Sequence, residues 1–153
     1  MKVTIPYTPR KQQAFIHTEL DKHRFSVLCC HRRFGKTVML INHLIKECMM
    51  NKNHQPRFAY IAPTYSQAKK IAWDYLKFYT KGLPGTKYNE TELRCDFFNG
   101  ARITLLSSEN PDSIRGIYLD GVVCDEASQI SRELIDEVIR PALSDRKGWM
   151  VLC

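Results

Sequence analysis

Short apolar runs and longer amphipathic stretches alternate along this chain. The runs at 25–30, 57–62, 120–125 and 149–153 have the length of strands, and the first is apolar enough to be a buried strand. Between the first two runs, residues 36–50 carry apolar side chains at i, i+3 and i+4 spacing, which predicts an amphipathic helix packed on a core. Strands that alternate with helices favour an α/β domain with a mainly parallel sheet.

Two further helices are predicted between the later strands. One is expected over 66–79, with large apolar residues on one side and lysines elsewhere. The apolar residues are Ile71, Tyr75 and Phe78, and the lysines are Lys69, Lys70 and Lys77. The other is expected over 131–140, where Pro141 should end it because proline disfavours a helical conformation in the residue before it.

The dipeptide Asn99-Gly100 separates two apolar runs, LRCDFF and ARITLLSS. Asn-Gly is the strongest short signal for a hairpin, because a type I′ turn needs positive φ at both of its central residues. We therefore expect a β-hairpin around this dipeptide, next to the mainly parallel sheet.

Composition narrows the class of protein. The 153 residues are one domain's worth of chain, 44% hydrophobic and 25% charged, as in ordinary globular proteins. No apolar run approaches the roughly 18 residues of a membrane span, and the N-terminus lacks the apolar segment of a signal peptide. The six cysteines form no C-x-x-C pair, so we expect reduced thiols rather than disulfides or a zinc site. We expect neither membrane insertion nor secretion.

Charge is spread unevenly over the two halves of the chain. The net charge is +7, but the residues through Lys81 include 15 basic and 4 acidic side chains, a net of +11. From Gly82 onward there are 8 basic and 12 acidic side chains, a net of −4. A basic balance suggests a polyanionic partner, and the first half is where it would bind.

The segment CHRRFGKT, residues 30–37, joins the first predicted strand to the first predicted helix. Its Gly35, Lys36 and Thr37 match the end of the phosphate-loop pattern G-x-x-x-x-G-K-[ST], which occurs in this strand–loop–helix setting. The glycine lets backbone N–H groups approach phosphates, the lysine reaches the β- and γ-phosphates, and the threonine hydroxyl binds Mg²⁺.

The match to this pattern is partial, because Cys30 stands where the first glycine would be. A bare G-K-T also occurs by chance in surface loops. Arg32 and Arg33 favour a phosphate site, since they place cations where phosphates would lie, although both are also compatible with solvated surface charges.

The segment GVVCDEAS, residues 121–128, is an apolar run that ends in Asp125 and Glu126, as in a Walker B strand. In that motif the Asp completes the Mg²⁺ shell and the Glu polarises the attacking water. Alone, the pattern is equally typical of a strand followed by an exposed acidic turn. The two motifs can converge at the carboxyl ends of a parallel sheet, so together they predict nucleotide hydrolysis. The Asp-Glu pair and the absence of N-K-x-D argue against a switch GTPase.

Four stretches in order along nearly the whole chain resemble the N-terminal ATPase domain of the large terminase subunit, the DNA-packaging motor of tailed bacteriophages. YTPRKQQAFI is similar to the adenine-contacting glutamine motif, with Gln12 the better match and Gln13 the second candidate. CHRRFGKT is similar to the family's deviant Walker A, in which an arginine, here Arg32, stands three residues before the G-K glycine. YIAPTYSQAKKIAWDYLK and SSENPDSIRGIYLDGVVCDEAS resemble the segments that follow, the second containing Walker B.

This resemblance implies a RecA-like (ASCE) P-loop NTPase fold, with a mainly parallel central sheet flanked by helices plus the hairpin around Asn99-Gly100. It implies ATP and Mg²⁺ as cofactors. The residues implied for nucleotide binding are Gln12, Arg32, Arg33, Phe34, Gly35, Lys36 and Thr37, those for Mg²⁺ are Thr37 and Asp125, and those for catalysis are Glu126, Lys36, Arg32 and Arg115. In some members the equivalent of Arg115 is proposed as an arginine finger that reaches a neighbouring subunit's nucleotide. An exposed arginine that stabilises its own turn is an equally good interpretation.

The partners implied by the resemblance are double-stranded DNA, other copies of the chain in a ring, the portal protein and the small terminase subunit, in the host cytoplasm and away from membranes. The lysines Lys69, Lys70 and Lys77 are candidates for DNA contact, or simply a solvated helix face. We interpret residues 1–153 as one P-loop ATPase domain.

The chain departs from the family's pattern in two ways. It stops within or at the end of the strand after Walker B, before the coupling motif, and it lacks the nuclease domain. We therefore expect a truncated ATPase domain without nuclease activity. A helicase-type translocase core, and a nucleotide-binding or assembly module without turnover of its own, stay open as alternative functions.

Overall fold

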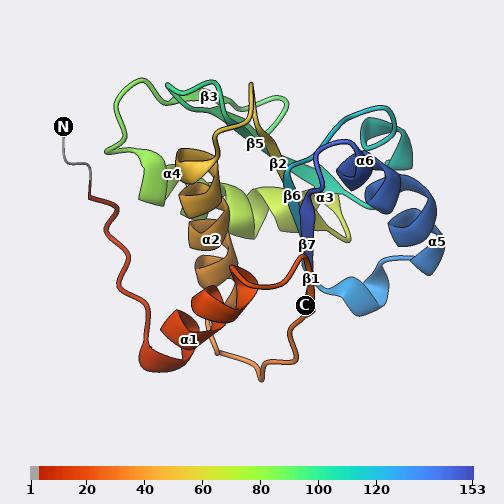
Figure 1. Cartoon of the computed structure of the whole chain (residues 1–153), viewed down its shortest axis with the longest axis horizontal. Coiled ribbons are helices and arrows are strands. Elements are labelled where there is room, and N and C mark those ends of the chain that lie inside the picture. The colour runs from red at the N-terminus through yellow and green to blue at the C-terminus, as the bar shows by residue number, and fades with distance from the viewer. Residues whose placement is uncertain (1–3) are drawn as a thin grey trace.

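A seven-stranded sheet with helices on both faces forms the centre of the computed structural model, which describes residues 4–153 (Figure 1). The strand order is β1-β7-β6-β2-β5-β4-β3. The five strands from β1 to β5 in this order pair in parallel, whereas β4 is antiparallel both to β5 and to β3. The strands are β1 (Phe25–Val27), β2 (Arg57–Ala62), β3 (Lys87–Asn89), β4 (Arg94–Asp96), β5 (Arg102–Ser107), β6 (Gly121–Cys124) and β7 (Trp149–Leu152). The predicted α/β class with a mainly parallel sheet is confirmed.

Two helical layers cover the sheet (Figure 1). On one face, α1 (Lys11–Leu20), α2 (Lys36–Met50) and the helix made of α3 (Tyr65–Gln67), η1 (Ala68–Trp73) and α4 (Asp74–Thr80) contribute to a core that includes Phe58 and Ile103 of the sheet. On the other face, α5 (Arg132–Leu134), η4 (Ile135–Ile139) and α6 (Arg140–Ser144) pack over Ile61, Val122 and Met150. The helix predicted over 36–50 is confirmed with its apolar stripe buried.

Burial differs sharply along the sheet. The inner strand β6 is buried on both faces, as is usual for parallel strands between two helical layers. The edge strand β1 is not: Val27 is 70% exposed and Phe25 is also exposed. The sequence predicted a buried strand over 25–30, and this is wrong in both extent and burial, because among the described residues β1 pairs on one side only, with β7.

The helical segment 65–80 exposes the apolar side chains that the sequence singled out. Ile71, Tyr75 and Phe78 all face solvent. The core is filled instead by Trp73, whose ring is buried and whose indole N–H donates to Glu90 at 2.7 Å. The buried residues of the segment are Ala68, Ala72, Trp73, Leu76 and Thr80. The spacing therefore placed the three apolar side chains on one side correctly, but that side is the exposed one.

Pro141 does not end the helix that precedes it. The helix continues through α6 to Ser144, and Pro141 lies in the first turn of α6, directly after the π-helical turn η4. Proline has no N–H to donate and is tolerated in the first turn of a helical segment. The predicted stop was therefore wrong because the helix changes its hydrogen-bonding pattern just before the proline.

The predicted hairpin is present as β4 and β5, but its turn differs from the expected type. Only Gly100 of the pair has positive φ, at 81°, and the Phe97 carbonyl accepts from the Gly100 N–H at 3.0 Å. The side chain of Asn99 instead donates to the Cys48 carbonyl at the end of α2, at 2.9 Å. This tertiary contact fixes the turn. The short strand β3, which extends the sheet beyond β4, had no clear sequence signal.

Candidate active site

A cavity of about 330 Å³ lies at the carboxyl ends of β2 and β6, beside the loop that follows β1. Ligand sites of open parallel sheets occur at this edge. Both predicted motifs contribute to its wall, through Arg32, Lys36, Thr37, Asp125 and Glu126. The remaining lining residues are Tyr60, Ala62, Pro63, Gln67, Ile71 and Gln129. Two motifs far apart in the sequence thus share one pocket that is basic on one side and acidic on the other.

The loop before α2 is held against α1. Its Phe34 carbonyl accepts hydrogen bonds from the Gln13 side-chain amide, at 3.2 Å, and from the Arg10 guanidinium. Gly35 has a φ of 83°, and a Cβ there would lie 3.0 Å from Gln13 Nε2. The left-handed backbone favours glycine at this position, and a Cβ would also require the Gln13 and Arg10 side chains to shift. Lys36 and Thr37 follow in the first turn of α2, where backbone N–H groups have no partner within the helix.

The acidic side of the cavity centres on Asp125, directly after β6. One carboxylate oxygen, Oδ2, accepts from the Tyr60 hydroxyl. The other, Oδ1, accepts from the Cys153 thiol at 3.3 Å and from the Glu126 N–H at 3.0 Å. Glu126 is exposed and has a φ of 50°, which turns the chain sharply after the strand. Asp125 is therefore fixed by three donors, while the next residue projects freely.

Burial and the neighbouring carboxylate raise the pKa of both side-chain donors. Burial raises the pKa of Tyr60 well above its usual value, and the negative charge of Asp125 adds to this effect. The pKa of the Cys153 thiol is raised for the same two reasons, burial first. Both groups therefore carry their protons at neutral pH and can donate to Asp125.

The two glutamines of the YTPRKQQAFI segment have different surroundings. Gln13 is only 5% exposed, and its side chain is engaged by Phe34 and by the Arg10 N–H. Gln12 lines a separate hollow of about 680 Å³ next to the phosphate-type loop. The other residues of this hollow are Lys11, Phe15, Ile16, Cys29, Cys30, His31 and Phe34. Gln12 thus faces open space, while Gln13 supports the loop.

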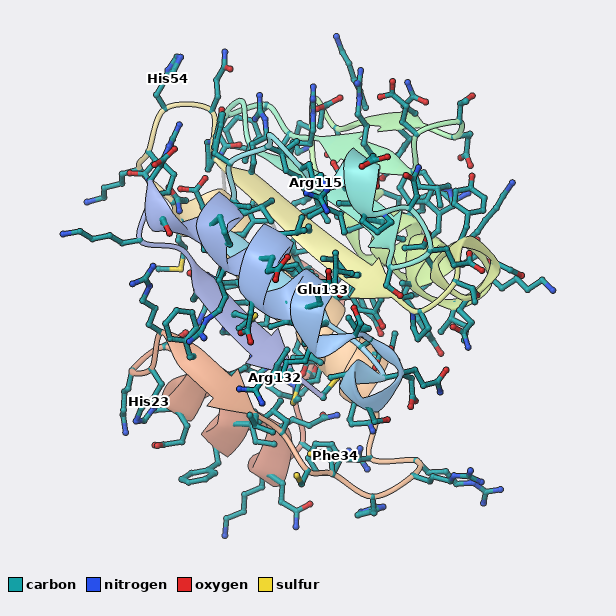
Figure 2. All side chains as sticks on the ribbon, turned by 90° about the vertical axis from the view of Figure 1, so that its right-hand side faces the viewer. His23, Phe34, His54, Arg115, Arg132 and Glu133 are labelled. Carbon is teal, nitrogen blue, oxygen red and sulfur yellow. The ribbon has the colours of Figure 1, made fainter. Side chains whose placement is uncertain are left out.

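Two of the predicted arginines do not line the 330 Å³ cavity. Arg33 is exposed, with a φ of 63°. The Arg115 side chain is 61% exposed and forms a 3.5 Å ion pair with Asp112. Figure 2 shows Arg115 and Phe34 in different parts of the molecule, far apart in that view. Arg115 borders another hollow, which Glu137 and Asp145 also line.

The three lysines proposed for DNA contact differ from one another. Lys69 and Lys70 are exposed, whereas Lys77 pairs with Glu90 at 3.1 Å. Only the first two are free of close acidic partners among residues 4–153.

Sequence reasoning missed several residues of the site: Tyr60, Gln67, Gln129 and Cys153. The signal for Tyr60 was weak, a single hydroxyl within the apolar strand RFAYIA. Its role depends on strand register, because Tyr60 pairs with Val123, two residues before Asp125. Register between distant strands cannot be read from either segment alone.

Comparisons with known proteins point to one family. The family model described as terminase large subunit, T4likevirus-type, N-terminal, matches residues 31–152. The large terminase subunit of Thermus virus P23-45 is 28% identical over 165 residues, covering 95% of this chain and 33% of that protein. The chain thus spans about a third of the length of the curated relatives it matches.

Solved structures show the same fold. The large terminase ATPase domain of Thermus phage P74-26 superposes with a TM-score of 0.79 at 26% identity, covering 97% of this chain and 65% of that one. The large terminase of a thermophilic bacteriophage, solved in complex with ADP, gives a TM-score of 0.74 at 17% identity, covering 94% and 38%. In the described part of the chain, no helix is both long and apolar enough to cross a membrane.

Proposed function

The chain belongs to the family of T4-like-virus-type terminase large subunit N-terminal domains, and we propose that it hydrolyses ATP to power the translocation of double-stranded DNA into a viral procapsid. The observation that carries this proposal is the single cavity that contains Lys36 and Thr37 of one motif and Asp125 and Glu126 of the other. A cation-rich loop opposite an acidic pair is what phosphoryl transfer needs, because positioning and charge stabilisation supply most of its catalysis. We propose residues 1–153 as the ATPase domain of such a motor.

The basic side of the cavity would bind the triphosphate. Lys36 and Arg32 line it and would neutralise phosphate charge. The unpaired N–H groups at the start of α2 would add further donors, which Gly35 allows to approach closely. Gln12 and the hollow it lines would receive the base.

The acidic side has the donor set that Mg²⁺ prefers. The Thr37 hydroxyl and the Asp125 carboxylate line the same cavity, and both offer hard oxygen ligands. Asp125 already accepts three hydrogen bonds, and a carboxylate has about four acceptor positions, so it can still accept from a water of a metal shell. When bound, Mg²⁺ would neutralise charge on the β- and γ-phosphate oxygens.

Glu126 is the residue that we assign to the attacking water. It lies next to Asp125 in the cavity wall, exposed and without the three donors that fix its neighbour. A positioned general base contributes a factor of about 10² to 10⁴ to the rate. Arg115, which lies away from the cavity of its own chain, would supply positive charge to the cavity of a neighbouring copy in a ring.

Partners beyond the nucleotide follow from the family. We propose double-stranded DNA, the portal protein and the small terminase subunit, with Lys69 and Lys70 as the free basic residues for DNA. Binding through such residues should weaken steeply with salt, because phosphate contacts release counterions.

Replacing Glu126 with Gln tests the assignment. Glu126→Gln keeps the shape of the side chain, so ATP binding should persist while hydrolysis falls by about 10² or more. Glu133→Gln, the same change at an exposed acid on α5, is the matched control and should hydrolyse ATP like the parent. Steady-state hydrolysis with and without DNA, and nucleotide binding by calorimetry, are the measurements.

Undiminished hydrolysis by Glu126→Gln would refute the role of this residue. A parent chain that binds ATP but never hydrolyses it would favour the assembly-module alternative instead.

A further inference from the structure

The carboxylate of Asp125 is fixed by the hydroxyl of Tyr60, a residue outside both nucleotide motifs. We propose that Tyr60 is a positioning residue, which orients Asp125 within the cavity that Thr37 also lines and thereby sets the affinity of the site for its divalent cation. This proposal rests on the proposed nucleotide-binding function. It adds a residue of strand β2 to those that set the metal affinity of the site.

Tyr60 can hold the carboxylate in one orientation because its own side chain is packed in the core. It lies in the middle of β2, is almost fully buried and belongs to the core cluster beneath α2. The strand register fixes its position along β2 relative to Asp125, since Tyr60 pairs with Val123 of β6 and Asp125 follows two residues later. A rigid ring with few rotatable bonds loses little entropy when it makes a directed hydrogen bond.

The hydroxyl shares its cavity with the two predicted metal-binding residues. It donates to Asp125 Oδ2, and Thr37 lines the same cavity. Thr37 belongs to α2 and Asp125 follows the end of β6, so α2, β2 and β6 each contribute a polar side chain to this wall. Groups that orient a metal ligand from outside the coordination shell typically contribute about 10- to 100-fold in metal affinity.

Both carboxylate oxygens of Asp125 accept hydrogen bonds. Tyr60 contacts one oxygen, while the Cys153 thiol and the Glu126 N–H contact the other. With both oxygens engaged, rotation of the carboxylate about its Cβ–Cγ bond breaks at least one hydrogen bond. The orientation is thus set before a cation arrives, and preorganisation of this kind raises affinity by lowering the ordering cost of binding.

The variant Tyr60→Phe removes the hydroxyl and keeps the ring. Its matched control is Tyr88→Phe, which removes another partly buried hydroxyl, bonded to Thr80 at 2.8 Å and absent from the cavity wall. Calorimetric titration of ADP at a series of Mg²⁺ concentrations separates metal affinity from nucleotide affinity. We expect Tyr60→Phe to raise the half-saturating Mg²⁺ about 10-fold, with ADP affinity in EDTA unchanged.

A double-variant cycle tests whether Tyr60 acts through Asp125. In the Asp125→Asn background, the loss of the Tyr60 hydroxyl should have no further effect on the half-saturating Mg²⁺. Thermal unfolding of each variant identifies the temperature range in which all of them are folded, and the titrations are made there.

Each contrary result has a distinct meaning. If the parent protein binds ADP without any Mg²⁺ dependence, the proposed nucleotide site fails, and this proposal with it. If the parent is metal-dependent and Tyr60→Phe matches it, only the role of Tyr60 is refuted. An equal rise in Tyr88→Phe, or an undiminished effect in the Asp125→Asn background, would also refute it.

Discussion

Asp125 and Arg115, two charged residues implied for the same reaction, have opposite surroundings. Asp125 follows a buried strand and accepts hydrogen bonds from three donors. Arg115 lies in a surface loop after a short 3₁₀ turn, Pro111–Ser113, and pairs with an exposed Asp112. One side chain is held by three hydrogen bonds in a cavity wall, and the other is exposed with a single surface ion pair.

This difference indicates where each residue can act. A carboxylate fixed inside a cavity can only serve that cavity, and its fixed orientation favours a demanding ligand such as a metal ion. An exposed ion pair contributes only about 0–1 kcal/mol, so Arg115 can leave Asp112 at little cost. Its position outside its own cavity is what a group acting on a neighbouring molecule requires.

The largest effect is expected from Arg115→Ala. If this variant kept full activity, the loop that carries Arg115 would have no part in the reaction. In the assembled protein we expect hydrolysis to fall about 10³-fold, the lower end for an arginine finger. Arg132→Ala, on the exposed start of α5, is the control and should retain activity. Hydrolysis is measured for the assembled variants.

Mixing subunits distinguishes action on a neighbour from action within one chain. A mixture of Arg115→Ala and Glu126→Gln subunits contains interfaces with an intact Glu126 on one side and an intact Arg115 on the other. Some activity should return in the mixture, and the absence of any recovery would assign Arg115 a purely local role.

A smaller effect is expected from Asp125→Asn, which tests the role of the carboxylate that three donors hold in place. The amide keeps the shape but removes the charge, so the half-saturating Mg²⁺ for nucleotide binding should rise about 100-fold. Arg115→Ala should leave that value unchanged, because Arg115 does not line the cavity of its own chain. Calorimetry at varied Mg²⁺ measures both, and an equal shift in the two variants would contradict the distinction.

The smallest effect is expected on the packing between β6, the strand that precedes Asp125, and β7. A Cβ at Gly121, where β6 begins, would overlap with the Trp149 ring on β7. Gly121→Ala should therefore lower the free energy of unfolding by about 1–3 kcal/mol through overpacking. Gly82→Ala, where a Cβ meets open space, should stay within about 0.5 kcal/mol of the parent. Urea unfolding measures both, and equal stabilities would show that Trp149 can move aside.

Much of the fold could be predicted because its signals are local. The apolar stripe of α2 and the six-residue run of β2 follow from spacing within one segment, and both have the predicted bounds. The phosphate-type loop and the acid pair could be identified for the same reason, since each combines a strand end with its own functional residues. Their meeting in one cavity followed from the rule that parallel strands share a carboxyl edge.

Most of the remaining features depend on residues far apart in the sequence. Spacing grouped Ile71, Tyr75 and Phe78 on one side of their helix, but which side packs on the sheet is decided by tertiary contacts. The continuation through Pro141 is local and follows from the π-helical turn η4 just before it. The turn at Asn99 is set by a bond to Cys48 of α2, and the exposure of β1 is set by its place in the strand order.

The residues of the two motifs could therefore be identified from the sequence, while the orientation of the Asp125 carboxylate is a property of the folded sheet. Lys36, Thr37, Asp125 and Glu126 follow from residue type and spacing, because a phosphate loop and an acidic strand end are each built from a few consecutive residues. Tyr60 and Cys153 contact Asp125 only because three strands lie side by side in one register. Hydrogen bonds between distant strands depend on positions in space that no single segment encodes.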